Sequence, residues 1–157
     1  MIDEIRDALA ACTVLTLAYV DEHGAPAACA VFYALTPDGS PIFVSSSSTR
    51  HGRTLSAVPG GTPVAFTAQA DDQTWQTLRG VQGRGICHRL TGDELSTAQA
   101  AYIARFPFIT ADDHLTHALA AADHYRITPT WLRLIDNSRG FAHKTEWPNP
   151  LPPPPPA

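Results

Sequence analysis

Four consecutive serines, followed by a threonine, an arginine and a histidine, form the stretch of this sequence whose side chains are best suited to bind an anion. They follow the apolar run Ile42–Val44, which is typical of a buried strand. Thr49 is a residue type that caps helices, and a short helix is expected from Arg50 to Val58. A strand that ends in hydroxyls, free backbone N–H groups, a helix dipole and a guanidinium predicts a phosphate site. The alternative is a solvated loop with an ordinary cap, and the junction alone does not decide between them.

Charge distribution favours the anion site. Residues 39–92 carry five arginines and two aspartates, a net charge of +3, whereas the rest of the chain carries six basic and thirteen acidic residues, a net charge of −7. A locally basic segment in an acidic protein indicates a discrete anion site more than a general affinity for polyanions.

Other chemistry-bearing patterns in the chain are weaker. The aspartates and histidines between Asp112 and His124 resemble a metal cluster, because His114 and His117 share a helix face, but an alanine-rich surface helix with polar residues explains them better. We therefore predict no metal site. The sequence has no Gly-x-Ser-x-Gly motif, which disfavours hydrolase chemistry.

Length and composition indicate one globular domain. The chain has 157 residues, 44% of them hydrophobic, and a net charge of −4, which disfavours nucleic-acid binding. No charged-then-apolar leader and no membrane-length apolar run is present, so we expect a cytoplasmic protein that does not enter the membrane. Three widely spaced cysteines (Cys12, Cys29 and Cys87) are expected to be reduced thiols.

Hydrophobic periodicity and turn residues predict seven strand-like segments and four helices. The helices are expected at Ile2–Ala11, Arg50–Val58, Gly92–Arg105 and Ala111–Ala122. The strands are expected at Thr13–Val20, Ala27–Leu35, the run from Ile42, Thr62–Gln69, Thr74–Leu90, His124–Ile135 and Phe141–Trp147.

These elements predict a mainly β fold: a small barrel of antiparallel strands with an N-terminal helix, a short helix after the third strand and two consecutive helices before the C-terminal strands. Gly80, Gly83 and Gly85 indicate a bulge, sharp coiling or close backbone approach to a ligand, and three glycines within six residues favour a heavily bent barrel strand. Residues 1–147 are expected to form the single domain. Residues 148–157 form a proline-rich tail, expected to be disordered or extended.

Several short motifs, in this order and spacing, resemble the split β-barrel of the pyridoxamine 5'-phosphate oxidase-like, flavin-binding superfamily, and within it a small uncharacterised bacterial subgroup. The resemblance extends up to Trp147. The motifs are Phe32-Tyr33, Thr49-Arg50-His51, Leu78-Arg79-Gly80-Val81-Gln82, Arg105-Phe106-Pro107, and Asp136-Asn137 with Gly140-Phe141.

The resemblance implies FMN bound at the interface of a homodimer, with its phosphate held by the strand-to-helix segment. Two departures from the superfamily pattern are visible: His51 stands where many members carry a lysine, and Ala27–Ala30 holds no second phosphate-binding arginine. The implied cofactor contacts are Ser45, Ser46, Thr49, Arg50, His51 and Gln82.

The flavin ring also needs an apolar or aromatic surface, and Phe32, Trp75 and Trp131 are the candidates, although each of them also fits the core. Two classes of function remain open. One is an FMN-dependent oxidoreductase acting on a small molecule, in which the cofactor transfers the electrons. The other is a non-enzymatic module that binds a flavin, haem or another anionic ligand on the same barrel.

Overall fold

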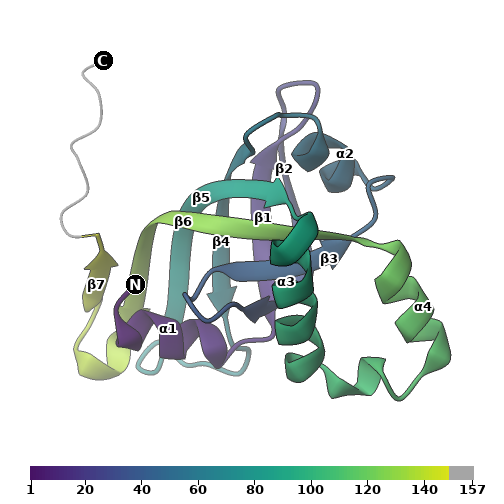
Figure 1. Cartoon of the computed structure of the whole chain (residues 1–157). Coiled ribbons are helices and arrows are strands. Elements are labelled where there is room, and N and C mark those ends of the chain that lie inside the picture. The colour runs from purple at the N-terminus through teal and green to yellow at the C-terminus, as the bar shows by residue number, and fades with distance from the viewer. Residues whose placement is uncertain (149–157) are drawn as a thin grey trace.

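Six antiparallel strands close into a barrel, and a seventh strand extends one side of it (Figure 1). The computed structural model describes residues 1–148, so most of the predicted proline-rich tail lies outside the described residues and its conformation stays a prediction. The strands are β1 Val14–Val20, β2 Pro26–Leu35, β3 Pro41–Ser45, β4 Thr62–Gln69, β5 Arg79–Arg89, β6 Asp123–Asp136 and β7 Lys144–Trp147.

The order of the strands is β3-β2-β1-β4-β5-β6-β7, and β3 also pairs with β6 to close the barrel. All seven strand pairs are antiparallel, including pairs of strands far apart in the chain such as β3 and β6. The predicted fold class is confirmed. The helices are α1 Asp3–Ala10, α2 Arg50–Ser56, α3 Gly92–Arg105 and α4 Asp113–Ala121, with 3-10 turns η1 Pro107–Ile109 and η2 Asn137–Arg139.

The barrel core is filled by alternate residues of each strand and by the two helices that close its ends. In β4 the pattern alternates strictly, with Val64 and Phe66 inside. In Figure 1, α1 and α2 lie at opposite ends of the barrel, and Ile5 and Leu9 of α1 and Leu55 of α2 belong to its core. A second apolar cluster lies outside the barrel wall, where α3 and η1 pack on β2 and β3.

Glycines in β5 permit close packing within the barrel. A Cβ at Gly83 would overlap the buried ring of Phe66, and one at Gly85 would lie 2.5 Å from the Thr128 carbonyl oxygen. The close approach considered from the sequence was to a ligand, whereas within residues 1–148 the neighbours of these glycines are other strands. The pairing register of β5 and β6 shifts at Gly85 opposite Pro129, which confirms the predicted bulge.

Two strand boundaries were predicted too early in the chain. Residues 74–78 form a turn, because the Thr77 hydroxyl accepts the Thr74 N–H at 3.0 Å, and β5 begins only at Arg79. The last strand begins at Lys144 instead of Phe141, since Ala142 has a positive φ of 57°. No helix among the described residues has the length and apolarity needed to cross a lipid bilayer.

Candidate functional site

The predicted phosphate-binding junction, residues 45–51 between β3 and α2, is built around the hydroxyl of Thr49. Its Oγ1 accepts the Gly52 N–H at 3.0 Å and donates to the Ser46 carbonyl at 2.8 Å, so the predicted N-cap is confirmed. Gly52 fits because a Cβ there would overlap the Ser46 carbonyl oxygen. The cap therefore folds the serine loop tightly against the first turn of α2.

A chain of side-chain contacts joins the junction to the end of the barrel. Ser45 Oγ lies 2.7 Å from His51 Nε2 and 3.2 Å from Thr49 Oγ1. The imidazole meets the ring of Tyr19 edge-on, with 6.5 Å between centroids. Burial lowers the pKa of His51 below its usual 6.5, which keeps the ring neutral at pH 7 when no ligand is bound.

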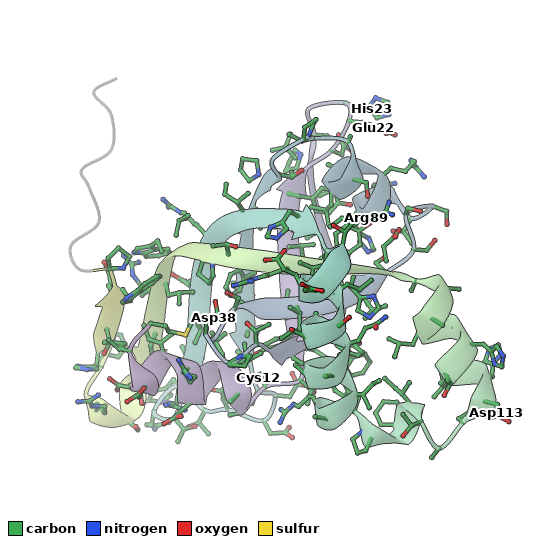
Figure 2. The ribbon with its side chains drawn as sticks, viewed as in Figure 1. Cys12, Glu22, His23, Asp38, Arg89 and Asp113 are labelled. Atoms are coloured by element: carbon green, nitrogen blue, oxygen red, sulfur yellow. The ribbon has the colours of Figure 1, made fainter. Side chains whose placement is uncertain are left out.

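Two arginines in α2 have different surroundings. Arg53 donates to the Ser48 carbonyl at 2.9 Å and lies 3.6 Å from a carboxylate oxygen of Glu22, in the β1–β2 hairpin labelled in Figure 2. Arg50 is exposed, and its guanidinium makes no hydrogen bond or ion pair within residues 1–148. The backbone N–H groups of Arg50 and His51 also have no acceptor there. The junction thus presents one free cation and two free N–H donors.

The barrel is split beside this junction. β2 pairs with one edge of β3 only over Tyr33–Leu35, while the other edge of β3 pairs with β6 over Ile42–Ser45. The β3-side edge of β2 therefore has no strand partner from Pro26 to Phe32 within the described chain. Phe32 is 55% exposed and lines one apolar groove together with Val44, the residue before Ser45. The split leaves a free strand edge on β2, and the exposed ring of Phe32 lies where that edge begins.

The other predicted cofactor residues lie elsewhere on the chain. Trp131 is 6% exposed and packs between the guanidinium groups of Arg84 and Arg133, 5.0 and 4.9 Å from its ring centroid. Gln82 lies half-buried on the outer side of β5, opposite Arg133 in the neighbouring strand. The structure does not bring either residue to the junction of the same chain.

Trp75 is farther from the junction still. It is 68% exposed in the turn before β5 and contacts Phe141 edge-on at 6.4 Å. β4 separates the two sites, since Thr62 at one end bonds to α2 and Gln69 at the other end leads toward the turn. An eight-residue strand spans about 23 Å. One chain therefore does not place Trp75 against a ligand held at the junction.

Sequence reasoning missed two residues of the junction. Tyr19 contacts His51, but it lies at an ordinary inward position of β1, and nothing local distinguishes it from core. Gly52 carried a usable signal, because glycine inside a short helix costs about 1 kcal/mol relative to alanine and so indicates a close approach.

The outer side of the barrel has a second feature, a groove of about 490 Å³ across β1, β4, β5 and β6. Small residues such as Ala18, Pro63 and Ala65 form its floor, and Arg84 lies at its side without an ion pair within residues 1–148. The neighbouring outward positions are also small and exposed, namely Thr16, Ala28, Ala30 and Thr67.

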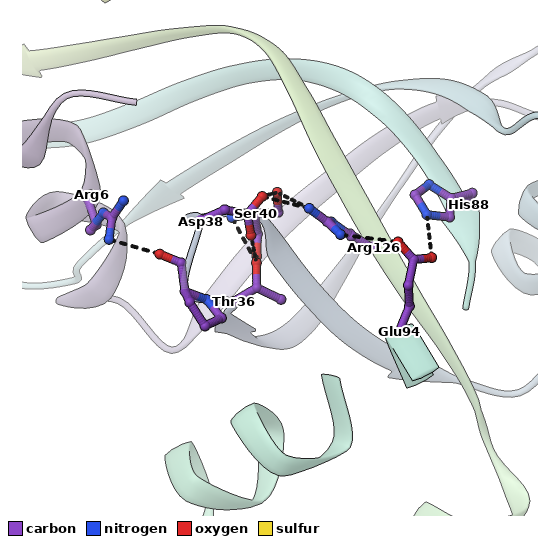
Figure 3. Close-up of polar contacts among 8 residues, drawn as sticks. Arg6, Thr36, Asp38, Ser40, His88, Glu94 and Arg126 are labelled. Atoms are coloured by element: carbon purple, nitrogen blue, oxygen red, sulfur yellow. Dashed lines mark hydrogen bonds and ion pairs between the residues drawn. The ribbon is translucent and has the colours of Figure 1, made fainter. Parts of the chain in front are cut away.

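A third polar region lies at the start of β3, where a turn and two strands meet (Figure 3). Arg126 of β6 lies 2.6 Å from Asp38 and 3.5 Å from Glu94, and it donates to the Ser40 hydroxyl at 3.3 Å. Burial alone would raise the pKa of Asp38. The pKa is lowered overall, because Thr36 and Ser40 donate hydrogen bonds to the carboxylate and Arg126 lies beside it. In this cluster the arginine is paired with two carboxylates. Within residues 1–148, no three His, Cys, Asp or Glu side chains are grouped closely enough to hold a metal ion.

Solved structures share this fold. A haem-binding protein of Mycobacterium smegmatis superposes with a TM-score of 0.70 at 25% identity, over 90% of this chain and 56% of its own. An FAD-binding protein of the same species gives a TM-score of 0.61 at 17% identity, over 84% of this chain and 91% of its own. Both are consistent with the split-barrel architecture.

The sequence matches no family model. It is 31% identical over 117 residues to a UPF0306 protein of Klebsiella pneumoniae subsp. pneumoniae, an alignment that covers 74% of this chain and 72% of the relative. Identity of that level over most of both sequences establishes kinship, and the chain belongs to the UPF0306 family.

Proposed function

We propose that this protein is a cytoplasmic, FMN-binding member of the pyridoxamine 5'-phosphate oxidase-like superfamily that acts as a flavin-dependent oxidoreductase on a small molecule. The observation that carries the proposal is the free guanidinium of Arg50 beside the split in the barrel. A guanidinium can bind two phosphate oxygens with parallel hydrogen bonds, while the free N–H groups of Arg50 and His51 bind a third.

The junction alone does not supply enough free energy for tight binding. A hydrogen bond to a charged group contributes roughly 1.5–3 kcal/mol, whereas micromolar affinity requires about 8.2 kcal/mol. The contributions come from Arg50, one or two serine hydroxyls and the N–H groups. If their free energies were fully additive, they would supply about half to most of the 8.2 kcal/mol. The flavin ring must supply the rest, and Phe32, which lines one groove with the residue before Ser45, is the exposed aromatic candidate.

The free edge of β2 explains how the ring is oriented. Unpaired backbone N–H and C=O groups between Pro26 and Phe32 offer both donors and acceptors, which the polar edge of an isoalloxazine requires. The small side chains of Ala28 and Ala30 allow a flat ring to approach the strand. The bound flavin would supply the electron-transfer chemistry, and the chain's own residues position it and set its surroundings.

A homodimer is part of the proposal. The outer groove and the small exposed residues around it form an uncovered sheet face of the kind that a second subunit buries. Gln82, Arg84 and Trp131 lie on or beside this face, so a second copy would bring them near the other subunit's split. Light scattering that gave only monomer across micromolar concentrations would contradict this arrangement.

The solved structures of similar fold support a ligand-binding role and keep one alternative open. Since one of them is a haem-binding protein at 25% identity, the second candidate function is a non-enzymatic module that binds haem or another anionic ligand. The two candidates predict different spectra: a bound flavin absorbs in the visible range with two broad bands, whereas bound haem gives one intense Soret band.

The test is a calorimetric titration of the dialysed full-length protein with FMN, riboflavin and haemin in parallel. The proposal predicts one FMN per chain and an affinity for FMN about thirtyfold above that for riboflavin, which lacks the phosphate. Saturable haemin binding without FMN binding would replace the proposal with the binding-module alternative. Equal affinities for FMN and riboflavin would contradict the assignment of the phosphate site.

A further inference from the structure

α4 and the barrel form an apolar groove, of which the FMN proposal uses only Phe32. We name it the arm groove; its volume is about 380 Å³. In Figure 1, α4 extends away from the barrel, and none of its nine residues is buried. The principal lining residues are Phe32, Phe106, Phe108, Leu115, Ala118 and Leu119.

The two walls of the arm groove differ in kind. One wall is a chain of aromatic rings, with Phe32 and Phe106 edge-to-face at 5.6 Å and Phe106 and Phe108 at 6.0 Å. The opposite wall is the aliphatic side of α4. A slot between rings and aliphatic carbons suits a flat, apolar molecule, and no charged residue lines it.

His124 is a buried polar residue next to the lining of the arm groove. The side chain is 2% exposed, and neither ring nitrogen has a hydrogen-bond partner within residues 1–148. It lies directly opposite Val44 in the β3–β6 pair and two residues after Ala122, and both of those residues line the groove. Opposed residues of an antiparallel pair project to the same face, so the imidazole is directed to the groove side of the sheet.

An imidazole without partners limits what the arm groove can bind. Burial lowers the pKa of His124, although the Ala122 backbone and the Asp123 charge oppose the shift, so the ring is neutral at pH 7 with one N–H donor and one acceptor nitrogen. A purely apolar occupant, such as a side chain from a second copy, would leave both nitrogens unsatisfied. A ligand with one hydroxyl or carbonyl would satisfy one of them.

We propose that the arm groove is the substrate site beside the FMN site, and that it takes a neutral, planar aromatic molecule with one hydroxyl or carbonyl group. The inference rests on the proposed function, because Phe32 belongs both to the arm groove and to the split where the flavin ring is placed. The groove itself is formed by one chain without any cofactor, so its binding can be measured separately.

The experiment titrates the full-length protein, without FMN, with 2-naphthol at pH 7 and follows the naphthol fluorescence. We expect saturable binding of one molecule per chain. Ala118→Trp, which fills the groove, should weaken binding at least tenfold. The matched control Ala120→Trp lies on the same helix but outside the lining and should keep the affinity within twofold.

A second arm tests the role of His124. His124→Leu and His124→Asn are titrated with 2-naphthol and with naphthalene, and circular dichroism checks that they fold. Wild type should prefer 2-naphthol about tenfold, and the leucine variant should lose that preference. If either variant fails to fold, the comparison of Ala118→Trp with Ala120→Trp still tests the site. Unchanged binding by Ala118→Trp, or equal losses in both tryptophan variants, would overturn the inference.

The same proteins are titrated with FMN, and light scattering measures their molar mass in solution. FMN binding without 2-naphthol binding would overturn this inference and leave the proposed function standing. Binding of 2-naphthol without FMN would support the ligand site and contradict the FMN proposal. A change of mass in Ala118→Trp, with no 2-naphthol binding by wild type, would assign the arm groove to a second copy and overturn the inference.

Discussion

The two ends of the five-residue strand β3 each carry an arginine cluster. The two clusters differ in whether the arginine is paired with carboxylates. At the start of the strand, Arg126 is paired with Asp38 and Glu94 and also bonds to Ser40. At the end of the strand, the hydroxyls bond to one another and to the backbone, and Arg50 has no partner within residues 1–148.

This difference predicts that one cluster contributes to stability and the other to ligand binding. A half-buried cation surrounded by carboxylates stabilises the fold, because removing it leaves those groups unpaired. An exposed cation with no partner stabilises little, yet it is available to an anionic ligand. Arg126 is therefore expected to affect folding and Arg50 to affect binding, although the two residues flank the same short strand.

The largest expected effect is on stability. Arg126→Ala should lower the free energy of unfolding by about 2 kcal/mol, the value of a lost charged hydrogen bond, and leave FMN affinity within twofold. Arg50→Ala is the matched control and should stay within about 0.5 kcal/mol of wild type. Urea unfolding measures both. Equal destabilisation by the two variants would remove the distinction between the two ends.

The pH dependence of Arg126→Ala sharpens the same prediction. Because the pKa of Asp38 is lowered in the folded state, its contribution is present above the unfolded value of 3.8 and is lost as the pH falls through the folded pKa. The advantage of wild type over Arg126→Ala should therefore shrink in acid. A constant difference down to the acid transition would show that Arg126 acts through packing alone.

A smaller effect is expected from the aromatic residue next to the binding end of β3. Phe32→Ala should weaken FMN binding about fivefold, since an aromatic contact contributes roughly 0.5–1.5 kcal/mol beyond area burial. Trp75→Ala should leave the affinity unchanged, because Trp75 lies at the other end of β4. Fluorescence titration of both variants with FMN shows which of the two residues contacts the flavin ring. If only Trp75→Ala lost FMN affinity, the flavin ring would be assigned to the turn before β5 of a second subunit.

The smallest expected effect concerns His51. Its pKa is lowered by burial, and a phosphate dianion would raise it by favouring the imidazolium. A group whose pKa rises on binding strengthens the complex most in mild acid, so FMN affinity should fall as the pH rises through the bound-state pKa. The expected change is about threefold, because such an ion pair contributes roughly 0.2–1 kcal/mol.

The variant His51→Lys tests that pH dependence. Lysine stays charged with a pKa of about 10.4, so affinity near pH 8 should increase and the dependence should flatten. FMN itself takes up a proton near pH ~6, which weakens binding, and a parallel riboflavin titration separates that contribution. Parallel affinity curves for wild type and His51→Lys would show that His51 does not contact the phosphate.

The fold was predictable because its signals are local. Strict alternation in Thr62–Gln69, tight turns and the Thr49 cap each identify their own element without reference to distant residues. The strand boundaries near Thr74 and Phe141 were wrong for the same reason. A threonine–threonine hydrogen bond and an alanine with positive φ override the β-forming residue types there.

The site was only partly predictable, because it depends on which segments come together across the barrel. The junction is contiguous in sequence, so Ser45, Thr49 and His51 were identified together, and the structure brings them together. The divergence of β2 from β3 and the contact of Tyr19 with His51 are set by pairing partners far apart in the chain. Residue types alone do not determine that pairing, so neither feature was predicted.

The central claim is that Arg50 binds the phosphate of FMN, and the most direct measurement is the ratio of FMN to riboflavin affinity in Arg50→Ala and Arg53→Ala. Arg53 is the matched control, because it lies in the same helix and is already held by Ser48 and Glu22. The account predicts a loss of about 2 kcal/mol, about thirtyfold, for FMN and almost none for riboflavin in Arg50→Ala, with the ratio kept in Arg53→Ala. An unchanged ratio in Arg50→Ala would contradict it.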